Sequence, residues 1–478
     1  MLKQLLLFFL CCISYSLYSQ SVSISDSEDL NFRNDDFSVI GLYQNDIVCF
    51  LQKEKEVKLL FYSSSMQKKK EIKLSFLPNR FSNLHFYTNN KELIVLYEVS
   101  ESKSLKLYAS KLQNSSDLTW QEPIVLSKKP LGNYKDNFSY SISASNNNEV
   151  FLAHTIYFDE GSVQLQAVTF DINLKITQSI NQSFKDGEMN YPIASAISNK
   201  GNCFILTGEK ISNKEIYEQL KLLELRPFAN EFTSFSINTE KNTFSDLQLN
   251  VDNKNQILYI SSFFHQSKYA SPKGFFLTTF DIDNRAFSTS RFTRIAIQNS
   301  ISNSDLKELS IRKMLIKENG NVTIITEKYY QTSRIINSIN PMMGTSFMMA
   351  NDNSRRVTEY NYEEINLFNF KNDGSLVWSQ NVLKDQFTSD DGGIYSSFFC
   401  FEYPLGQVII FNDLSSRVTR LLAAYTTKDG KVSMKQIQTN EEIDEWNIMP
   451  RSAKQISKST MVIPCIMKNR LCFLKLNF

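Results

Sequence analysis

Polar turns and apolar runs alternate along nearly the whole chain. Each turn is rich in Asn, Asp, Gly or Ser, residue types that tolerate the backbone conformations of a tight reversal. The run after each turn is apolar at almost every position, which is typical of strands covered on both faces. These runs read DIVCFL (46–51), ELIVLYEV (92–99), EVFLAHTIY (149–157), NCFILTG (202–208), QILYISSFF (256–264), NVTIITEKYY (321–330), QVIIFND (407–413) and TMVIPCIM (460–467).

A short alternating strand precedes each of these turns, and it starts in most cases with an aromatic residue and a serine. The clear copies are Phe37-Ser38, Phe81-Ser82, Phe138-Ser139, Phe244-Ser245 and Tyr395-Ser396. Degenerate copies are Tyr191-Pro192, Leu309-Ser310 and Trp446-Asn447. Successive starts are 44, 57, 53, 53, 65, 86 and 51 residues apart, so the chain contains eight copies of one internal repeat.

Each repeat continues with a third apolar strand and, in most copies, a more polar fourth strand. KLLFY (58–62) followed by EIKLSF (71–76) illustrates this order. Four strands repeated eight times predict an all-β fold, a β-propeller of eight blades with four antiparallel strands each. Seven blades remain possible if one degenerate copy is an excursion. We expect a single propeller domain over residues 20–478.

The last repeat stops after RLCFLKLNF (470–478) and therefore lacks its fourth strand. The alternating stretch SVSISDS (21–27) is left over before the first repeat. An N-terminal strand that pairs with the C-terminal blade would close the ring and hide two sheet edges. We expect this closure.

The N-terminus has the features of a signal peptide. Lys3 provides a positive charge, and the apolar stretch Leu5–Ile13 is too short to span a bilayer as a helix. Cleavage after Ser16 satisfies the small-x-small rule through Ser14, whereas cleavage after Ser19 leaves Gln20 first but has Leu17 at the third position before the cut. We favour the second, which makes residues 1–19 the signal peptide, because signal peptides of this type in Gram-negative bacteria often leave an N-terminal glutamine. The mature protein is then expected to be exported to the periplasm or the cell surface, without a later membrane-spanning segment.

The composition narrows the possible functions. The chain has 478 residues with 52 Lys and Arg against 50 Asp and Glu, so no overall charge favours nucleic acid. Only three histidines occur, His85, His154 and His265, and they fall in separate repeats. We interpret them as structural histidines with satisfied hydrogen bonds, and the sequence identifies no catalytic residue and no cofactor.

Five cysteines lie outside the signal peptide: Cys49, Cys203, Cys400, Cys465 and Cys472. Cys465 and Cys472 face each other if Lys468-Asn469 forms a two-residue turn. That register gives a hydrogen-bonded pair, whose wider Cα separation suits a disulfide poorly. Apolar packing of the two thiols is therefore favoured, and a disulfide between them remains the alternative.

The segment KDQFTSDDGGIYSS (384–397) is the most specific local feature. It joins two repeats and leads into an inner strand, so we expect it to cross one face near the central channel, where ligands commonly bind. The alternative is an ordinary solvated connection. Asp390 and Asp391 are also compatible with a calcium ion. The candidate binding residues are Lys384, Gln386, Asp390, Asp391 and Tyr395.

The sixth repeat contains a long hairpin excursion between Gln331 and Val357. Its methionine-rich centre is adaptable, which suits partner binding, although it could also fold back onto the propeller. The candidate contact residues are Met342, Met343, Phe347, Met348 and Met349.

The C-terminal third resembles a family of uncharacterised exported proteins of Gram-negative bacteria. The resemblance is carried by TEKYY (326–330), NLFNFKNDGSLVWSQNVLKDQFTSDDGGIYSSFF (366–399), IIFND (409–413) and RLCFLKLNF (470–478). In that family, paired aromatics precede a DG-x-x-x-W segment, a Lys-x-Gln and a DDGGYSSY-like run, which Ile394 interrupts here. The family has no known activity, so the resemblance implies shared structure only.

These features predict an exported, non-enzymatic propeller that acts as a scaffold for protein–protein interaction at the cell envelope. The alternative is a carbohydrate-binding or carbohydrate-active propeller. The run at 107–127 is similar to an Asp-box blade of sialidases, although Asp117 lies too close to Trp120 and the glycine is missing.

Overall fold

A computed structural model describes sixteen stretches of the chain. They are residues 21–31, 35–54, 56–114, 118–131, 138–159, 161–185, 191–211, 215–267, 270–288, 290–295, 306–337, 354–403, 406–414, 420–437, 447–467 and 470–478. The expected signal peptide (1–19) lies outside them. Within them the helical elements are two short 3-10 turns, η2 (Leu306–Glu308) and η4 (Pro450–Ser452), and the rest of the regular structure is strand.

The strands form antiparallel sheets that follow one another along the chain. The first four are β3 (Asp36–Tyr43), β4 (Asp46–Lys53), β5 (Glu56–Tyr62) and β6 (Lys68–Lys73); β7 (Ser82–Thr88), β8 (Leu93–Glu101), β9 (Ser104–Lys111) and β10 (Ile124–Pro130); β11 (Ser141–Ala144), β12 (Val150–Asp159), β13 (Ser162–Asp171) and β14 (Ile176–Lys185); and β15 (Tyr191–Ile197), β16 (Cys203–Lys210), β17 (Tyr217–Leu225) and β18 (Thr233–Ser236).

The next four sheets follow the same plan with additions. They are β19 (Thr243–Asp252), β20 (Ile257–His265), β21 (Gly274–Asp281), β22 (Ala286–Phe287) and β23 (Arg291–Arg294); β24 (Leu309–Ile316), β25 (Val322–Asn337), β26 (Ser354–Phe370), β27 (Leu376–Val382) and β28 (Gln386–Ser389); β29 (Phe398–Tyr403), β30 (Gly406–Asp413), β31 (Arg420–Thr427) and β32 (Val432–Gln436); and β33 (Asn447–Ile448), β34 (Lys454–Gln455), β35 (Thr460–Met467) and β36 (Arg470–Asn477) with β1 (Ser21–Ile24) and β2 (Glu28–Asp29).

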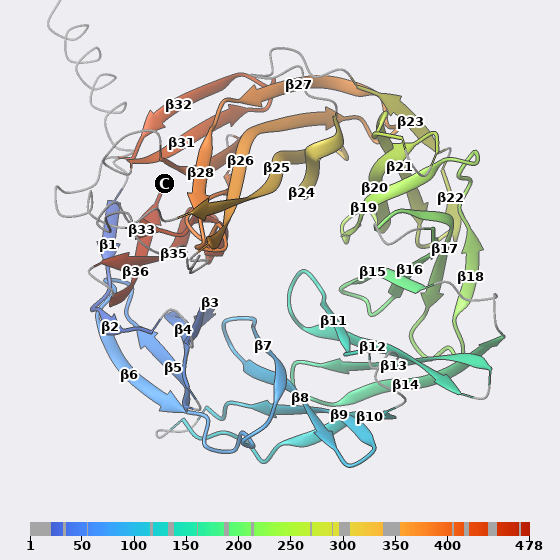
Figure 1. Ribbon diagram of the computed structural model, residues 1–478. Coiled ribbons are helices and arrows are strands. Elements are labelled where there is room, and N and C mark those ends of the chain that lie inside the picture. The colour runs from blue at the N-terminus through green and yellow to red at the C-terminus, as the bar shows by residue number, and fades with distance from the viewer. Residues whose placement is uncertain are drawn as a thin grey trace, which may run out of the picture.

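The sheets succeed one another around a central opening, as Figure 1 shows. The predicted fold class, an all-β propeller, is confirmed. Counted over the described residues there are eight sheets, with the fourth and fifth joined by the single pair Tyr217 and Phe244.

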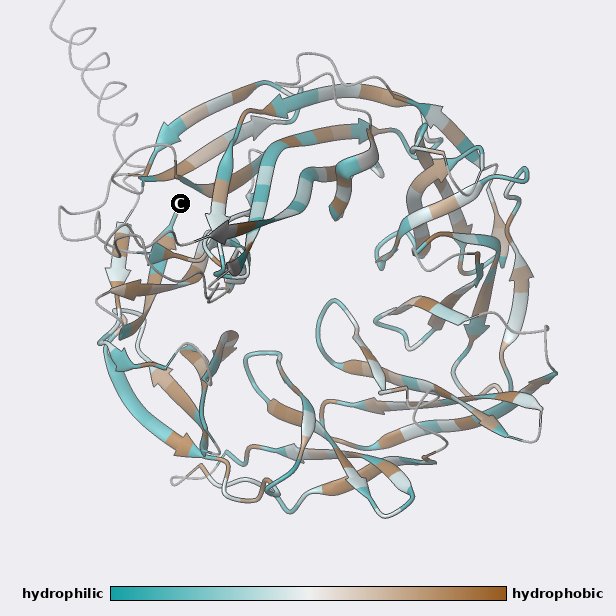
Figure 2. Cartoon of the chain, viewed as in Figure 1, coloured by the Kyte–Doolittle hydropathy of each residue, from teal (hydrophilic) through white to brown (hydrophobic). Residues whose placement is uncertain are grey.

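Eight apolar clusters pack successive sheets against each other in the described part of the chain. Along β4, Val48 and Phe50 pack against the second sheet. Their neighbours Ile47, Cys49 and Leu51 pack against the last sheet instead. The other six clusters join each remaining sheet to the next one. The central strands are therefore apolar on both faces, and Figure 2 shows brown residues concentrated along them.

The N-terminal strand completes the eighth sheet, as the leftover alternating stretch predicts. β1 pairs antiparallel with β36, with Val22 opposite Leu476 and Ile24 opposite Leu474. Val22 and Ile24 pack against the core between the seventh and eighth sheets. The pairing covers the edge that the last blade would otherwise expose.

Two local expectations need correction, and a third is confirmed. The seventh repeat starts at Tyr395 in sequence, but its strand β29 begins at Phe398 because a turn occupies the preceding residues. The first strand of the eighth blade is broken into β33 and β34, because Pro450 starts a 3-10 turn between them. The hairpin expected after Gln331 is confirmed for its described part, where β25 and β26 stay paired in register up to Asn337 and Ser354.

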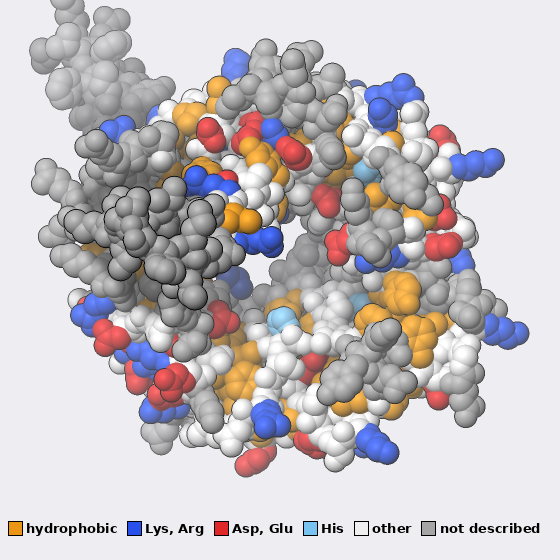
Figure 3. Space-filling view, in the orientation of Figure 1, with side chains coloured by type: hydrophobic (Ala, Val, Ile, Leu, Met, Phe, Trp, Pro, Cys, Tyr) orange, Lys and Arg blue, Asp and Glu red, His pale blue; other side chains and the backbone are white. Residues whose placement is uncertain are grey.

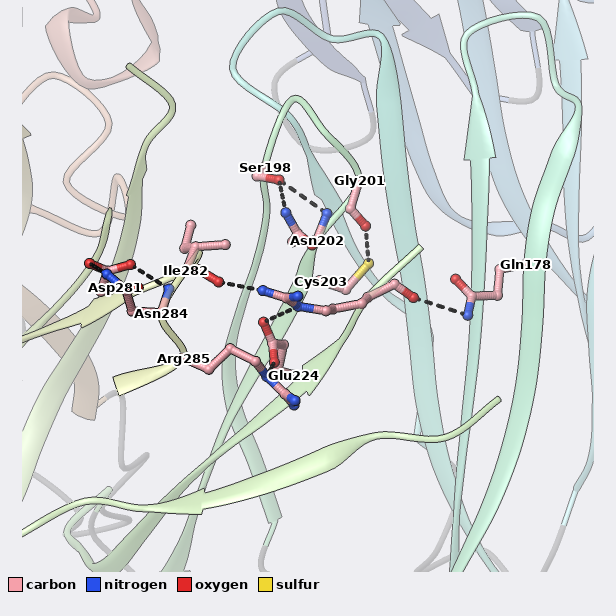
Figure 4. A network of polar contacts seen from close by, with 11 residues as sticks. Gln178, Ser198, Gly201, Asn202, Cys203, Glu224, Asp281, Ile282, Asn284 and Arg285 are labelled. Carbon is pink, nitrogen blue, oxygen red and sulfur yellow. Dashed lines mark hydrogen bonds and ion pairs between the residues drawn. The ribbon is translucent and has the colours of Figure 1, made fainter. Parts of the chain in front are cut away.

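A polar network around the buried Glu224 carboxylate and two partly exposed arginines links three successive sheets. Glu224 on β17 has a fully buried carboxylate, which accepts a hydrogen bond from Arg285 Nε at 2.8 Å and one from Arg226 Nε at 3.4 Å. Arg226 also donates to the Ile282 carbonyl at 2.6 Å, and its own carbonyl accepts from Gln178 on β14. Figure 4 shows this network running from β14 through the fourth sheet to the fifth.

The five described cysteines are free and buried. Cys465 and Cys472 are direct cross-strand partners, in the register that the sequence suggests. The Cys465 Sγ donates to the Cys472 carbonyl at 3.4 Å. The structure therefore places these thiols as apolar packing groups rather than as a bridge.

The closure by β1 makes a testable contribution to stability. The double substitution Val22→Ser and Ile24→Ser removes two partly buried apolar side chains, and we expect it to lower the free energy of unfolding by roughly 2 to 4 kcal/mol in urea denaturation. Ser23→Ala, on the other face of β1, should change it by less than about 0.5 kcal/mol. Equal stability of the double variant and the wild type would contradict the closure.

Candidate functional site

The sixth blade has a two-stranded extension that its neighbours lack. β24 pairs with β25 only as far as Lys328, and β27 pairs with β26 only from Ile365 onward. β25 and β26 nevertheless stay paired to Asn337 and Ser354. Residues 329–337 and 354–362 thus form an extension of the blade, and β28 adds to it beside Glu359–Tyr362. This arrangement places the predicted segment 384–397 directly on the extension.

A buried ion pair lies at the base of the extension. Lys384 Nζ lies 2.9 Å from Glu327 Oε1, and their side chains are 1% and 0% exposed. The other oxygen of Glu327 accepts hydrogen bonds from Arg312 Nε at 3.0 Å and from the Ser397 hydroxyl at 2.6 Å. A carboxylate buried this completely needs such partners, because losing its water shell costs several kcal/mol.

The same lysine joins the sixth blade to the seventh. Lys384 Nζ donates to the Tyr362 carbonyl at 3.1 Å and to Gln386 Oε1 at 3.0 Å. Gln386 Oε1 also accepts from the Ser397 amide at 2.7 Å, and its Nε2 donates to the Asn412 carbonyl on β30 at 2.7 Å. Burial lowers the pKa of Lys384, while the nearby Glu327 carboxylate opposes that shift.

Two tyrosines and two arginines lie beside the ion pair. The rings of Tyr329 and Tyr362 pack with their centroids 4.5 Å apart. The Arg312 guanidinium lies over Tyr329 at 5.5 Å, and Arg451 from η4 donates to the Tyr362 hydroxyl at 2.9 Å. Gly393 packs on the Tyr362 ring so closely that a Cβ would lie 2.8 Å from it. The turn around Gly393 is thereby held against the base of the extension.

Both predicted calcium ligands are engaged in local hydrogen bonds. Asp390, with φ +53°, accepts the Thr358 amide on one carboxylate oxygen at 2.9 Å and donates its own amide to the Thr358 carbonyl. Asp391 accepts the Gly393 amide at 2.8 Å. Among the described residues, no group of three or more His, Cys, Asp or Glu side chains is placed to hold a metal. Calcium at this turn stays a prediction.

The interpretation of 384–397 as a partner-facing loop is corrected at two residues. Lys384 and Gln386 are buried and bonded within the protein. Asp390 is exposed, whereas Asp391 and Tyr395 are partly exposed. The candidate contact residues Met342, Met343, Phe347, Met348 and Met349 lie outside the described residues.

The sequence interpretation missed Glu327, although a signal for it exists. In several blades the second strand has a polar residue at its sixth position. These residues are Glu98 in β8, Thr155 in β12, Ser262 in β20 and Glu327 in β25, and Asn412 takes the equivalent place in β30. Three of these residues bond to the chain that leads into the next blade. Glu98 accepts the Tyr140 amide at 2.6 Å, Asn412 donates to the Ile448 carbonyl at 2.7 Å, and Glu327 accepts from Ser397.

The extension also carries exposed apolar side chains. All residues from Gln331 to Ile335 are exposed, and Ile335 is 62% exposed. Leu383 and Phe387, on either side of the buried Lys384, are exposed as well. Figure 3 shows basic and acidic side chains of both signs around the central opening, so this face has no single charge.

The histidines differ in their surroundings. His265 has a hydrogen-bonding partner at each ring nitrogen, as expected for a satisfied histidine. His154 on β12 is fully buried, and neither of its ring nitrogens has a hydrogen-bond partner. Burial lowers the pKa of His154 to about 4. The expectation of satisfied histidines therefore fails for His154.

Comparisons with known proteins give similarity at the level of architecture only. No protein-family profile and no curated protein matches the chain. Solved structures similar to it include prolyl oligopeptidase B from Galerina marginata (10% identity, TM-score 0.44, 90% of this chain and 55% of that one). Others are the polysaccharide lyase Uly1 (9%, 0.40, 92% and 89%) and the β-propeller domain of the Trilobed protease from Pyrococcus furiosus (8%, 0.37, 88% and 96%). The chain spans about half the length of the first of these.

At these TM-scores the likeness carries no information about activity, and the fold assignment rests on the strand pairing and blade packing described above. No helix in the described stretches is long and apolar enough to cross a membrane.

The buried ion pair should show strong coupling in a double-mutant cycle. Lys384→Met leaves Glu327 short of a cation, and we expect it to lower the free energy of unfolding by about 3 to 5 kcal/mol. Adding Glu327→Gln should recover part of that loss. Lys73→Met, which breaks the exposed Lys73–Glu56 pair, should cost less than about 1 kcal/mol. Additive effects of the two core substitutions would contradict the coupling.

His154 should make stability depend on pH in a defined window. Its pKa of about 4 in the folded protein lies below the ordinary 6.5, so the unfolded chain binds the proton first. Stability is then lost as the pH falls from about 6.5 toward 4, by about 3 kcal/mol in total. His154→Leu should remove this part of the pH dependence in urea denaturation and leave the difference from wild type flat between pH 7 and 9. An unchanged slope at low pH would exclude His154 as its source.

Proposed function

We propose that the protein is an exported β-propeller scaffold that binds a protein partner at the cell envelope through the extension of its sixth blade. The observation that carries the proposal is the extension itself, a regular hairpin that runs beyond the four-stranded blade. A blade needs no such length to pack against its neighbours. The surplus strand length is available for contact with another molecule.

The base of the extension is rigid enough to present a contact surface. Glu327, Lys384, Gln386 and Ser397 form a continuous buried hydrogen-bonded network that holds the sixth and seventh blades together. A surface held in place loses little conformational freedom on binding, which favours affinity. The buried network thus supports binding by keeping the contact surface rigid, and its residues do not themselves touch the partner.

The exposed side of the extension has the mixed character of a contact surface. Ile335 is largely exposed, and the neighbouring Arg334 forms an ion pair with Glu359 at 2.7 Å. Apolar residues surrounded by polar and charged ones are typical of protein-binding patches. Phe387 adds exposed apolar area on β28, and the exposed Leu383 precedes that strand.

The methionine-rich residues lie between the two strands of the extension in sequence. We propose that Met342, Met343, Phe347, Met348 and Met349 extend the contact surface, since unbranched methionine side chains repack readily against different partners. Asp391 and Tyr395 remain candidates at its base, as they are partly exposed. The apolar N-terminal segment supports export, because its length suits a signal peptide.

The extension can be shortened in register to test this role. Replacing residues 334–357 by Asn-Gly would join Ser333 to its cross-strand partner Thr358 through a two-residue turn. We expect a thermal midpoint within about 3 °C of wild type. Capture of a partner from a cell-envelope extract, identified by cross-linking and mass spectrometry, should fall about tenfold or more. A tenfold fall in affinity corresponds to a loss of about 1.4 kcal/mol of binding free energy.

Phe228→Ser is the matched control, because Phe228 is a highly exposed apolar residue on another blade. It should leave the capture unchanged, whereas Ile335→Ser should reduce it. Undiminished capture by the shortened protein would overturn the proposal. Binding on a glycan array without any protein capture would favour the carbohydrate alternative instead.

A further inference from the structure

A serine and a histidine on the fifth blade form a second polar arrangement, apart from the extension. The Ser245 hydroxyl on β19 lies 2.9 Å from His265 Nε2 at the end of β20. The other ring nitrogen, His265 Nδ1, lies 2.9 Å from the Ala270 carbonyl oxygen. A hydroxyl, an imidazole and a backbone carbonyl are therefore joined by two successive hydrogen bonds.

The backbone acceptor determines the direction of both hydrogen bonds. A carbonyl oxygen can only accept, so His265 Nδ1 carries the proton and donates it to Ala270. The neutral imidazole then has its lone pair on Nε2, and the Ser245 hydroxyl donates to it. A hydroxyl that donates to a neutral imidazole held by a third group is the arrangement that activates a serine nucleophile.

The sheet holds the two side chains in place. Thr243 pairs with His265 and Ser245 pairs with Phe263, so Ser245 and His265 are diagonal neighbours on one face of the β19–β20 pair. The ladder is interrupted directly after Ser245, and Asp246 there has φ +52°. Aspartate tolerates this left-handed conformation, and an irregularity in the ladder changes the direction in which the neighbouring side chains point. Ser245 is partly exposed, whereas His265 is buried.

The charges around the pair keep the imidazole usable as a base. Burial lowers the pKa of His265, while the hydrogen bond to Ala270 and the charge of Asp246 oppose the shift. Asp246 in turn accepts the Ile311 amide at 2.9 Å and interacts with Arg312 on β24 and with Glu215. His265 is thus neutral at pH 7 and can accept a proton.

We propose that Ser245 is a nucleophile, with His265 as its general base, and that the site reacts with uncharged carboxylic esters. The nearby carboxylates of Asp246 and Glu215 disfavour an anionic substrate, and Arg312 is already bonded to Glu327. This chemistry goes beyond partner binding, and it involves a different blade.

The proposed step balances without an added cofactor. The Ser245 oxygen attacks the ester carbonyl carbon while its proton moves to His265 Nε2. The carbon–oxygen bond to the alcohol breaks, and the alcohol leaves with the proton from His265, so an acyl-serine remains. Water then attacks the acyl group, with His265 accepting and returning its proton, and the carboxylic acid is released.

Ser397, which precedes the seventh blade, provides an internal comparison. Ser397 also donates to a strong acceptor, but that acceptor is Glu327, which is already bonded to Lys384 and Arg312. Ser397 is buried, and its proton is part of a closed ion-pair network. We therefore expect Ser397 to be unreactive.

Labelling with a fluorophosphonate tests the proposal directly, because the serine oxygen forms a bond to phosphorus as the P–F bond breaks and the serine proton leaves with fluoride. We expect one adduct, located on Ser245 by peptide mass spectrometry, in the folded wild-type protein. Ser245→Ala should abolish it. His265→Gln should slow it by about a hundredfold, the usual contribution of a general base.

Ser397→Ala and the protein with the shortened extension are the controls, and both should label like the wild type. Circular dichroism and the thermal midpoint establish that each variant is folded. If His265→Gln does not fold, the pH profile of wild-type labelling replaces it: the rate should fall in acid, at a pH below the ordinary range of histidine. Hydrolysis of p-nitrophenyl acetate should follow the same order among the variants.

Absence of an adduct on Ser245 in the folded wild type would overturn the proposal. Labelling of folded His265→Gln at the wild-type rate, or a labelling rate independent of pH in acid, would do so too. Because the shortened extension leaves the fifth blade intact, these outcomes are independent of whether the extension binds a partner.

Discussion

The structure depends on burial of its central strands from both sides. A blade lies between two others, so a strand such as β4 must be apolar on both faces, with Val48 and Phe50 against one neighbour and Cys49 and Leu51 against the other. Such strands cannot be stable in an isolated sheet, where one face would meet water. The first and last blades consequently need each other, and β1 supplies the pairing that β36 would lack.

Polar groups inside this double-sided core must find partners there. Glu327 sits in a strand that is otherwise apolar, and Lys384, Arg312 and Ser397 come from three other segments to satisfy its two oxygens. Glu98 and Asn412 instead form hydrogen bonds with backbone groups of the chain that leads into the next blade. Buried polar side chains thereby connect these blades to the segments that lead into the next ones.

Much of the fold could be predicted because the signals are local. The turns, the apolar runs and the leftover alternating stretch at residues 21–27 are each recognisable within a few residues, and β1 pairs with β36 as expected. The candidate site was harder to predict, because the residues that contact each other there are far apart in the sequence. Lys384 and Gln386 lie in a polar segment that suggests exposure. Their burial depends on distant partners, Glu327 for Lys384 and the Asn412 carbonyl for Gln386. The sequence predicts the hairpin that β25 and β26 form beyond the blade, but not how far the two strands stay paired, because polar residues there alternate without an apolar face.

The direction of a hydrogen bond separates a structural serine from a reactive one. Ser397 donates to a carboxylate whose charge is already balanced, so moving its proton there would break the ion pairs that hold two blades together. Ser245 donates to a neutral imidazole, whose protonation creates a cation that the nearby Asp246 can stabilise. The same fold thus contains one serine for which proton transfer costs stability and one for which it is electrostatically supported. Both serines lie at the start of a blade, where the backbone departs from the regular strand geometry and the surroundings of the side chain differ from one blade to the next.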